Sequence, residues 1–212
     1  MEHAPFLNHG WLEVITGCMF SGKTTKLIGC LEICRIAQQK LYLFKPTKDD
    51  RDSTTATVTH YGREWPIKLI NPGAETLSTL ADLIGQEELE KADVIGFDEA
   101  NFFSKLFIDL CEQLVGENMN KRVIVAGLDQ TFAGNPYGPM ADIMAIADDV
   151  SKLHAVCVVC KGLATKTQRL INGEPATKDS PQDIVGGSKA KPTDQGIVTY
   201  EARCRACHKI VK

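Results

Sequence analysis

The sequence lacks the features that would point to a membrane or to nucleic acid as a partner. No apolar stretch approaches the roughly 18 uninterrupted residues of a membrane-spanning helix. Its 24 basic residues are outnumbered by 27 acidic ones, and the net charge of -3 is unlike that of a typical nucleic-acid-binding domain. The first residues, MEHAPFLNHGW, lack the basic start and the apolar run of about 7 to 15 residues that a secretory signal needs. We therefore expect a soluble, cytoplasmic protein with no membrane or nucleic-acid partner.

The pattern of apolar residues predicts an α/β fold. The 212 residues are enough for one sizeable domain and a small second one, since domains most often contain about 100 to 150 residues. We expect strands at 11–16, 41–45, 93–97 and 122–128, weaker strands at 57–60 and 66–70, and helices at 24–39, 75–91 and 105–115. Strands that alternate with helices favour a parallel sheet flanked by helices. The residues after 152 contain too few apolar positions for a second large core, so we place a domain boundary near Val156.

A phosphate-binding loop follows the first predicted strand. Its sequence fits the pattern G-x-x-x-x-G-K-[ST] and stands between a strand and a helix, as its mechanism requires. The loop consists of Gly17, Cys18, Met19, Phe20, Ser21, Gly22, Lys23 and Thr24. The two glycines let backbone amides point at a phosphate, Lys23 reaches the β- and γ-phosphates of ATP, and the Thr24 hydroxyl binds Mg²⁺. The alternative is a glycine-rich turn that binds no nucleotide.

Two acidic residues, Asp98 and Glu99, close the apolar run DVIGF. A carboxylate at the carboxyl end of a parallel strand beside a phosphate loop is suited to hold Mg²⁺, and we assign this role to Asp98. Glu99 follows where the strand is ending, so its side chain can turn into the same cleft and act as general base for an alcohol acceptor. The alternative is that Glu99 caps the next segment or pairs with a lysine.

The eight cysteines fall into two groups. Four are scattered through apolar segments and are expected to be small buried residues: Cys18, Cys30, Cys34 and Cys111. Cys18 is a partial exception, because it lies in the phosphate loop, whose amide dipoles could lower its pKa. The other four form two CxxC pairs and predict a closed, tetrahedral zinc site of structural type: Cys157, Cys160, Cys204 and Cys207. The intervening residues 161–203 would form an excursion that the metal holds at its base. A redox role for either pair is the alternative.

Six motifs in chain order make this sequence resemble the zinc-containing thymidine kinases. They are GxMFSGKT at 17–24, DExxFF at 98–103, GLDxxF at 127–132, AVCxxC at 155–160, VGG at 185–187 and YExRCRxC at 200–207. The resemblance implies a RecA-like kinase domain at 1–156 and a zinc-binding lasso domain at 157–212. It also implies transfer of the γ-phosphoryl group of ATP to the 5′-hydroxyl of deoxythymidine, a homotetramer, and inhibition by thymidine triphosphate.

The resemblance also assigns roles to individual residues. Glu99 matches the general base of the family, and Arg51 matches an arginine near the phosphates. The matches to the thymine pocket are Met19, Phe102, Leu128, Phe132, Thr167 and Tyr200. The sequence departs from the family pattern at Asn101, where glutamine is usual, and in the longer segment 188–199.

Three other functions are compatible with parts of this pattern. One is a kinase for deoxyuridine or a purine nucleoside, because nothing before the predicted lasso fixes the base. Another is a P-loop ATPase whose zinc ribbon binds nucleic acid, which the net charge of -3 disfavours. The last is a structural adaptor with a vestigial nucleotide site, which the intact Lys23, Thr24, Asp98 and Glu99 disfavour.

Overall fold

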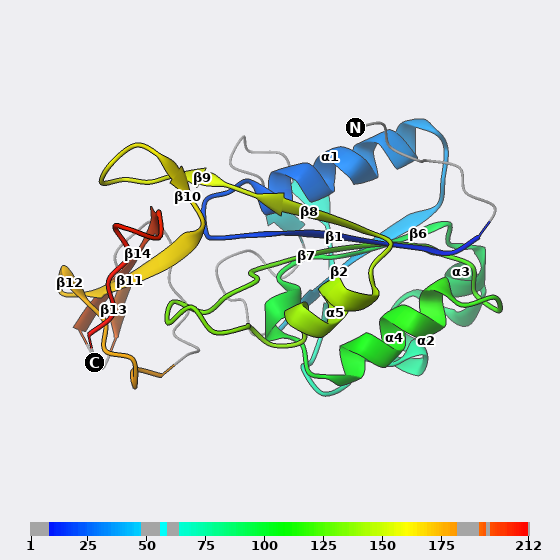
Figure 1. Ribbon diagram of the computed structural model, residues 1–212. Coiled ribbons are helices and arrows are strands. Elements are labelled where there is room, and N and C mark those ends of the chain that lie inside the picture. Colours follow the sequence, from blue (N-terminus) through cyan, green and yellow to red (C-terminus); the bar gives the residue numbers. More distant parts are fainter. Residues whose placement is uncertain (1–8, 48–55, 59–63, 182–190, 194–195, 212) are drawn as a thin grey trace.

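The central sheet of the protein has six parallel strands in the order β5-β2-β6-β7-β1-β8 (Figure 1). The computed structural model describes residues 9–47, 56–58, 64–181, 191–193 and 196–211. The strands are β1 (Trp11–Gly17), β2 (Leu41–Pro46), β5 (Lys68–Ile70), β6 (Val94–Phe97), β7 (Arg122–Gly127) and β8 (Asp149–Leu153). A short antiparallel pair, β3 (Ala56–Val58) and β4 (Glu64–Pro66), lies between β2 and β5 in the chain. The predicted α/β class and parallel sheet are confirmed.

Helices cover both faces of this sheet (Figure 1). On one face lies α1 (Lys23–Ile36), whose buried side chains pack with those of β2, β6 and β7. On the other face lie α2 (Leu77–Ile84), α3 (Gln86–Lys91), α4 (Leu106–Val115) and α5 (Met140–Ile146). All residues of β6 and β7 are buried, as expected for strands covered on both sides. No helix in the described part of the chain is long and apolar enough to cross a membrane.

The C-terminal part of the chain forms smaller antiparallel sheets at one end of the molecule (Figure 1). Its strands are β9 (Ala155–Val156), β10 (Leu163–Ala164), β11 (Lys166–Ile171), β12 (Glu174–Pro175), β13 (Lys191–Thr193) and β14 (Gly196–Arg203). The long strands β11 and β14 pair along their lengths, with Thr167 opposite Ala202 and Arg169 opposite Tyr200. We call this part, which begins after β8, the C-terminal subdomain.

The structure corrects two of the predicted elements and adds one strand to the central sheet and one helix to the layers around it. The helix expected at 75–91 is two helices, because Gly85 takes a positive-φ conformation, with φ 96° and ψ 141°, between α2 and α3. The strand expected at 66–70 is interrupted at Ile67, which separates β4 from β5. Strand β8 and helix α5 were not predicted. The four scattered cysteines are all buried, as expected.

Three phenylalanines form the core behind the end of β6. Phe107 on α4 lies 4.8 Å from Phe97 and 4.7 Å from Phe103 between ring centroids. All three rings are buried, and Phe103 comes directly after the short 3-10 helix η1 (Ala100–Phe102). The cluster therefore supports the segment that carries Asp98 and Glu99.

We predict that Phe107→Ala destabilises the protein strongly. Removing a fully buried aromatic ring loses its transfer free energy and leaves a cavity, which together cost about 3 to 5 kcal/mol. Chemical denaturation measures this change in the free energy of unfolding. Ile36→Ala is the control, since Ile36 is 73% exposed at the end of α1 and its loss should change stability by roughly 0.5 kcal/mol or less. Equal effects of the two substitutions would contradict the prediction.

Candidate active site and zinc centre

The phosphate-binding loop joins β1 to α1 in a backbone conformation that depends on glycine. Gly22, the N-cap residue of α1, has φ 86° and ψ 20° in the left-handed region. Gly17 has φ 142°, and a Cβ atom there would lie 2.4 Å from the carbonyl oxygen of Leu153. Lys23 Nζ donates to the Cys18 carbonyl oxygen at 2.9 Å, so this lysine lies across its own loop. The loop thus has the local geometry that phosphate binding requires.

Asp98 contacts the phosphate loop directly. The Thr24 hydroxyl donates to the Asp98 carboxylate, with Oγ1 at 3.1 Å from Oδ2 and 3.2 Å from Oδ1. Asp98 follows β6 and is 2% exposed. Burial, followed by the adjacent Glu99 carboxylate, raises its pKa to about 6, while the charge of Lys45 acts in the opposite direction. A hydroxyl and a carboxylate in contact are suitable oxygen ligands for Mg²⁺.

Glu99 follows Asp98 at the same edge of the sheet, and its backbone amide donates to the Asp98 carboxylate. Its backbone is in the left-handed region, with φ 53° and ψ 37°, where it forms the N-cap of η1. A non-glycine residue in this conformation carries backbone strain of order 1 to 3 kcal/mol, a feature common at active sites. Burial lowers the pKa of Lys23, and Glu99 and then Asp98 are the charges that oppose this shift. The two acids and the loop lysine therefore form one electrostatic group.

The predicted nucleoside residues gather beside the phosphate loop. Met19, Leu128 and Tyr200 pack in one apolar cluster with Val198, and Tyr137 packs against it. The ring of Phe102 lies 5.6 Å from that of Tyr137, in an edge-to-face arrangement. These residues come from the loop after β1, η1, the segment after β7, and β14. Such a mixture of aromatic and aliphatic side chains is typical of a pocket for a flat base.

The C-terminal subdomain touches the phosphate loop at two points. The Met19 backbone amide donates to the Thr167 hydroxyl at 3.0 Å. Cys18 Sγ lies 3.4 Å from the carbonyl oxygen of Ala164, and Cys18 packs in a small cluster with Ala202. Burial raises the pKa of the Cys18 thiol, so this cysteine is a packing residue that stays protonated.

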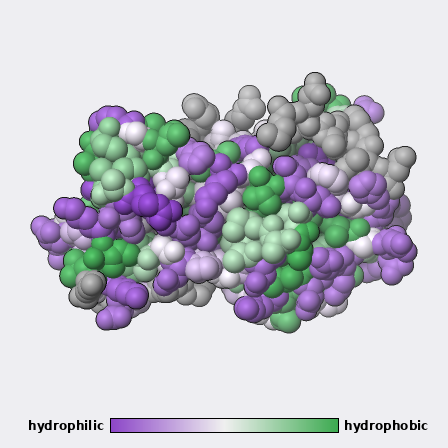
Figure 2. Space-filling view, viewed as in Figure 1, coloured by the Kyte–Doolittle hydropathy of each residue, from purple (hydrophilic) through white to green (hydrophobic). Residues whose placement is uncertain are grey.

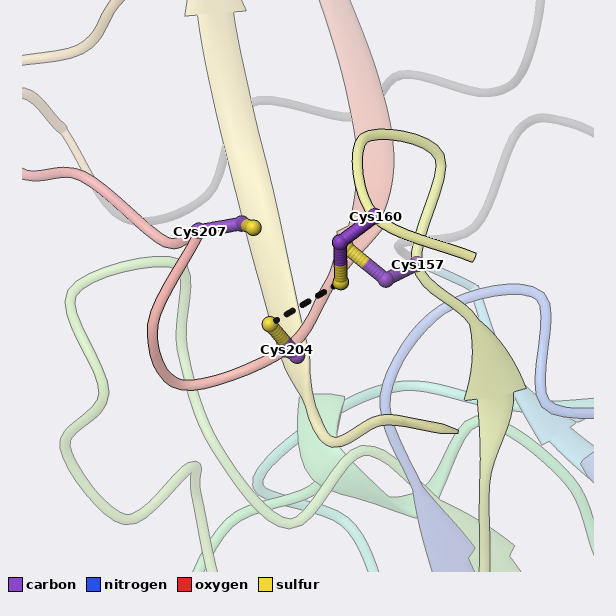
Figure 3. A group of neighbouring side chains, drawn as sticks. All are labelled: Cys157, Cys160, Cys204 and Cys207. Carbon is purple, nitrogen blue, oxygen red and sulfur yellow. Dashed lines mark hydrogen bonds between the residues drawn. The ribbon is translucent and has the colours of Figure 1, made fainter. Parts of the chain in front are cut away.

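The four cysteines of the CxxC pairs converge (Figure 3). Their sulfur atoms all lie within 4.8 Å of one another, and Cys160 Sγ is 3.6 Å from Cys204 Sγ. Four sulfurs around one Zn²⁺ at about 2.3 Å would stand roughly 3.8 Å apart, so the cluster fits this metal. Cys157 follows β9 and Cys204 follows β14, which places the site where the two small sheets meet. A tetrahedral set of four thiolates leaves no position for catalysis.

Comparison with known proteins agrees with this geometry. A sequence model of the family described as thymidine kinase matches residues 10–208. Curated thymidine kinases from two strains of Halobacterium salinarum are each 41% identical over 203 residues, which is 96% of this chain and 96% of theirs. The chain belongs to the thymidine kinase family. This membership confirms the expected thymidine kinase function and the ATP dependence of the kinase.

Arg51 and the motif at 185–187, both predicted from the family resemblance, lie outside the described residues.

The structure buries three charged residues near the site that the sequence analysis did not name. Asp129 is 3% exposed, with Lys152 Nζ 2.6 Å from its Oδ2, and Lys45 is buried at the end of β2. Arg169 is the third, and lies 2% exposed between pocket residues. The position of Asp129 in the GLDxxF motif was the one signal that could have identified it. Lys45 and Arg169 had no such signal, because burial of a charge depends on tertiary contacts.

Asn101 has a defined role despite its departure from the family pattern. Its side chain is 2% exposed, and its Oδ1 accepts from the Leu128 backbone amide at 2.9 Å. This bond joins η1, next to Glu99, to the segment after β7. The Asn101 amide therefore fixes Leu128, one of the predicted nucleoside residues, relative to the acidic pair.

We predict that Asp98→Asn stabilises the metal-free protein at neutral pH and above. The pKa of Asp98 is raised from 3.8 to about 6 on folding, so wild-type stability falls as the pH rises through this window. The variant lacks this titration, so its free energy of unfolding should exceed that of wild type by roughly 1 to 3 kcal/mol at pH 8. The difference should shrink toward zero near pH 4. Denaturant titrations in EDTA measure it, with the exposed Asp82→Asn on α2 as control. A gain that does not depend on pH would contradict the raised pKa.

We predict that Cys204→Ser abolishes zinc binding and weakens thymidine binding more than ATP binding. Structural zinc contributes roughly 10 to 16 kcal/mol to the folding of small zinc domains, so its loss should disorder the C-terminal subdomain. The central sheet and the phosphate loop come from earlier segments of the chain. Metal analysis and separate titrations of the two substrates test this, with Cys111→Ala as a control that keeps its zinc. Equal loss of both affinities would mean that the zinc centre supports the phosphate loop itself.

Proposed function

We propose that this chain phosphorylates the 5′-hydroxyl of deoxythymidine with the γ-phosphoryl group of ATP, and that Glu99 is the general base. The observation that carries this proposal is the placement of the phosphate loop, the acidic pair and the nucleoside residues at one edge of the sheet. Family membership supports the reaction, and the geometry supports the residue roles. The kinase domain is proposed to span residues 1–156 and the zinc-binding lasso domain residues 157–212.

The donor half of the site would hold ATP and Mg²⁺. The amides of residues 17–24 and the Lys23 ammonium, which now donates to the Cys18 carbonyl oxygen, would bind the phosphates. Thr24 and Asp98 would provide oxygen ligands for the metal, which when bound supplies positive charge to the transferred group. Arg51 is proposed to contact the same phosphates, on the strength of the family resemblance.

Glu99 is better suited than Asp98 to remove the proton from the acceptor. Asp98 is already engaged by the Thr24 hydroxyl and by the Glu99 backbone amide at 3.0 Å. Glu99 stands one residue further from the strand and has a left-handed backbone. A base in this position accepts the 5′-hydroxyl proton as the oxygen attacks the γ-phosphorus.

The nucleoside half of the site selects the base. Its walls are Met19, Phe102, Leu128, Phe132, Thr167 and Tyr200. Their apolar and aromatic surfaces accommodate a flat pyrimidine, and close packing limits the size of the base. The family resemblance assigns the motif at 185–187 to the same pocket. Activity with a panel of deoxynucleosides would measure the preference for thymidine directly.

Zinc is proposed to have a structural role. The enzyme is proposed to be cytoplasmic and to have no nucleic-acid partner.

The enzyme is also proposed to be a homotetramer, and this assembly rests on family resemblance. It has support from exposed aliphatic side chains on the β9–β10 hairpin, visible as a green patch at the upper left of Figure 2. These are Val156, Val158, Val159 and Leu163. Exposed apolar groups that cluster on one surface often mark protein contacts. Inhibition by thymidine triphosphate is likewise proposed from the family.

We predict that Glu99→Gln lowers the turnover of thymidine by about 10² to 10⁴-fold, the usual contribution of a general base. The amide keeps the shape of the side chain, so the binding of ATP and thymidine should change little. Steady-state kinetics with radiolabelled ATP measure turnover, and equilibrium titrations measure binding. Glu87→Gln, on the exposed side of α3, is the matched control and should behave as wild type. Normal turnover in Glu99→Gln would assign the base elsewhere, and label in nucleosides other than thymidine would change the proposed substrate.

A further inference from the structure

We propose that Arg169 is a positioning residue for the nucleoside pocket, where one buried guanidinium holds Phe132 and Tyr200 in place and ties both to the chain at Pro181. This inference rests on the proposed function, because it concerns the same pocket. Arg169 belongs to none of the motifs that identify the family, and it touches the pocket walls from behind.

The contacts of Arg169 reach three separate segments. Its Cζ lies 3.9 Å from the ring centroid of Phe132 and 5.4 Å from that of Tyr200. Its Nε donates to the Tyr200 hydroxyl oxygen at 2.9 Å, and its Nη1 donates to the carbonyl oxygen of Pro181. The side chain is 2% exposed. One residue thus joins the segment after β7, strand β14 and the segment after β12.

Strand register explains why Arg169 reaches these partners. On the paired strands β11 and β14, Arg169 lies directly opposite Tyr200. Thr167 stands two residues earlier on β11, and therefore on the same face, where it accepts from the Met19 amide. This face of β11 carries one side chain that contacts the phosphate loop and another that contacts the nucleoside pocket.

Phe132 is held by the C-terminal subdomain at both its ring and its backbone. Arg169 covers one face of the ring, and His208 Nε2 lies 2.9 Å from the Phe132 carbonyl oxygen. Yet Phe132 belongs to the segment between β7 and α5, which is part of the kinase domain. The orientation of this pocket wall therefore depends on a cation from the other part of the chain.

The geometry requires arginine rather than a positive charge alone. A guanidinium is flat, so it can stack on an aromatic ring while its edge donates hydrogen bonds in fixed directions. A lysine ammonium keeps the charge and part of the stem but cannot stack on Phe132 and donate to both Tyr200 and Pro181. Replacing Arg169 by lysine therefore separates the role of geometry from that of charge.

The first test is steady-state kinetics of the full-length, zinc-loaded Arg169→Lys enzyme. We expect the KM for thymidine to rise about tenfold or more, with kcat within roughly threefold of wild type and the KM for ATP unchanged. Zinc content should remain that of wild type. Arg35→Lys is the control, because Arg35 is exposed on α1, away from the site, and forms an ion pair with Glu32. It should leave both KM values unchanged.

The second test is a double-mutant cycle with Tyr200→Phe, which removes the acceptor of the Arg169 Nε bond. If Arg169 acts through Tyr200, the double variant should raise the KM for thymidine by clearly less than the product of the two single effects. Multiplicative effects would overturn this link, and an unchanged KM for thymidine in Arg169→Lys would overturn the proposal. A parallel rise of both KM values would show a general structural role and would also overturn it. Wild-type enzyme that does not phosphorylate thymidine would instead refute the proposed function.

Discussion

The hydrogen bond between Thr24 and Asp98 is the contact on which the arrangement of the site depends. It joins the start of α1 to the end of β6 across 74 residues of sequence. In the sheet only β7 separates β1 from β6, and all three strands run in parallel. Their carboxyl ends therefore meet at one edge, where open α/β sheets bind ligands. The phosphate loop, the acidic pair and the Leu128 wall of the pocket follow from this strand order.

The C-terminal subdomain completes this edge instead of forming a separate site. Thr167 accepts from the Met19 amide, and Cys18 packs in the same cluster as Cys157, one of the zinc-site cysteines. The phosphate loop and the cysteine cluster are therefore joined by packed side chains.

The sequence was informative where a function depends on a short segment and uninformative where it depends on tertiary contacts. The phosphate loop and the CxxC pairs have fixed local spacing, so their residues could be identified directly. Strand β8 was missed because its sequence, DVSKL, has polar residues that suit an edge strand and resemble a loop. Arg169 was missed because its partners lie 31 residues away at Tyr200 and on the segment after β7. The pocket residues were named by resemblance to a family, which periodicity alone could not supply.

The active edge is a region of stored electrostatic and conformational strain. Asp98 and Glu99 are adjacent carboxylates, burial raises the pKa of Asp98, and Glu99 has a left-handed backbone. Each of these features opposes folding, because charge is removed from water and the backbone leaves its preferred region. In the proposed reaction, a magnesium-bound nucleotide would bring positive charge to the two acids and an anion to Lys23, and so would relieve part of this repulsion. Binding of the proposed substrates would then stabilise the folded protein at the edge where its own groups are arranged least favourably.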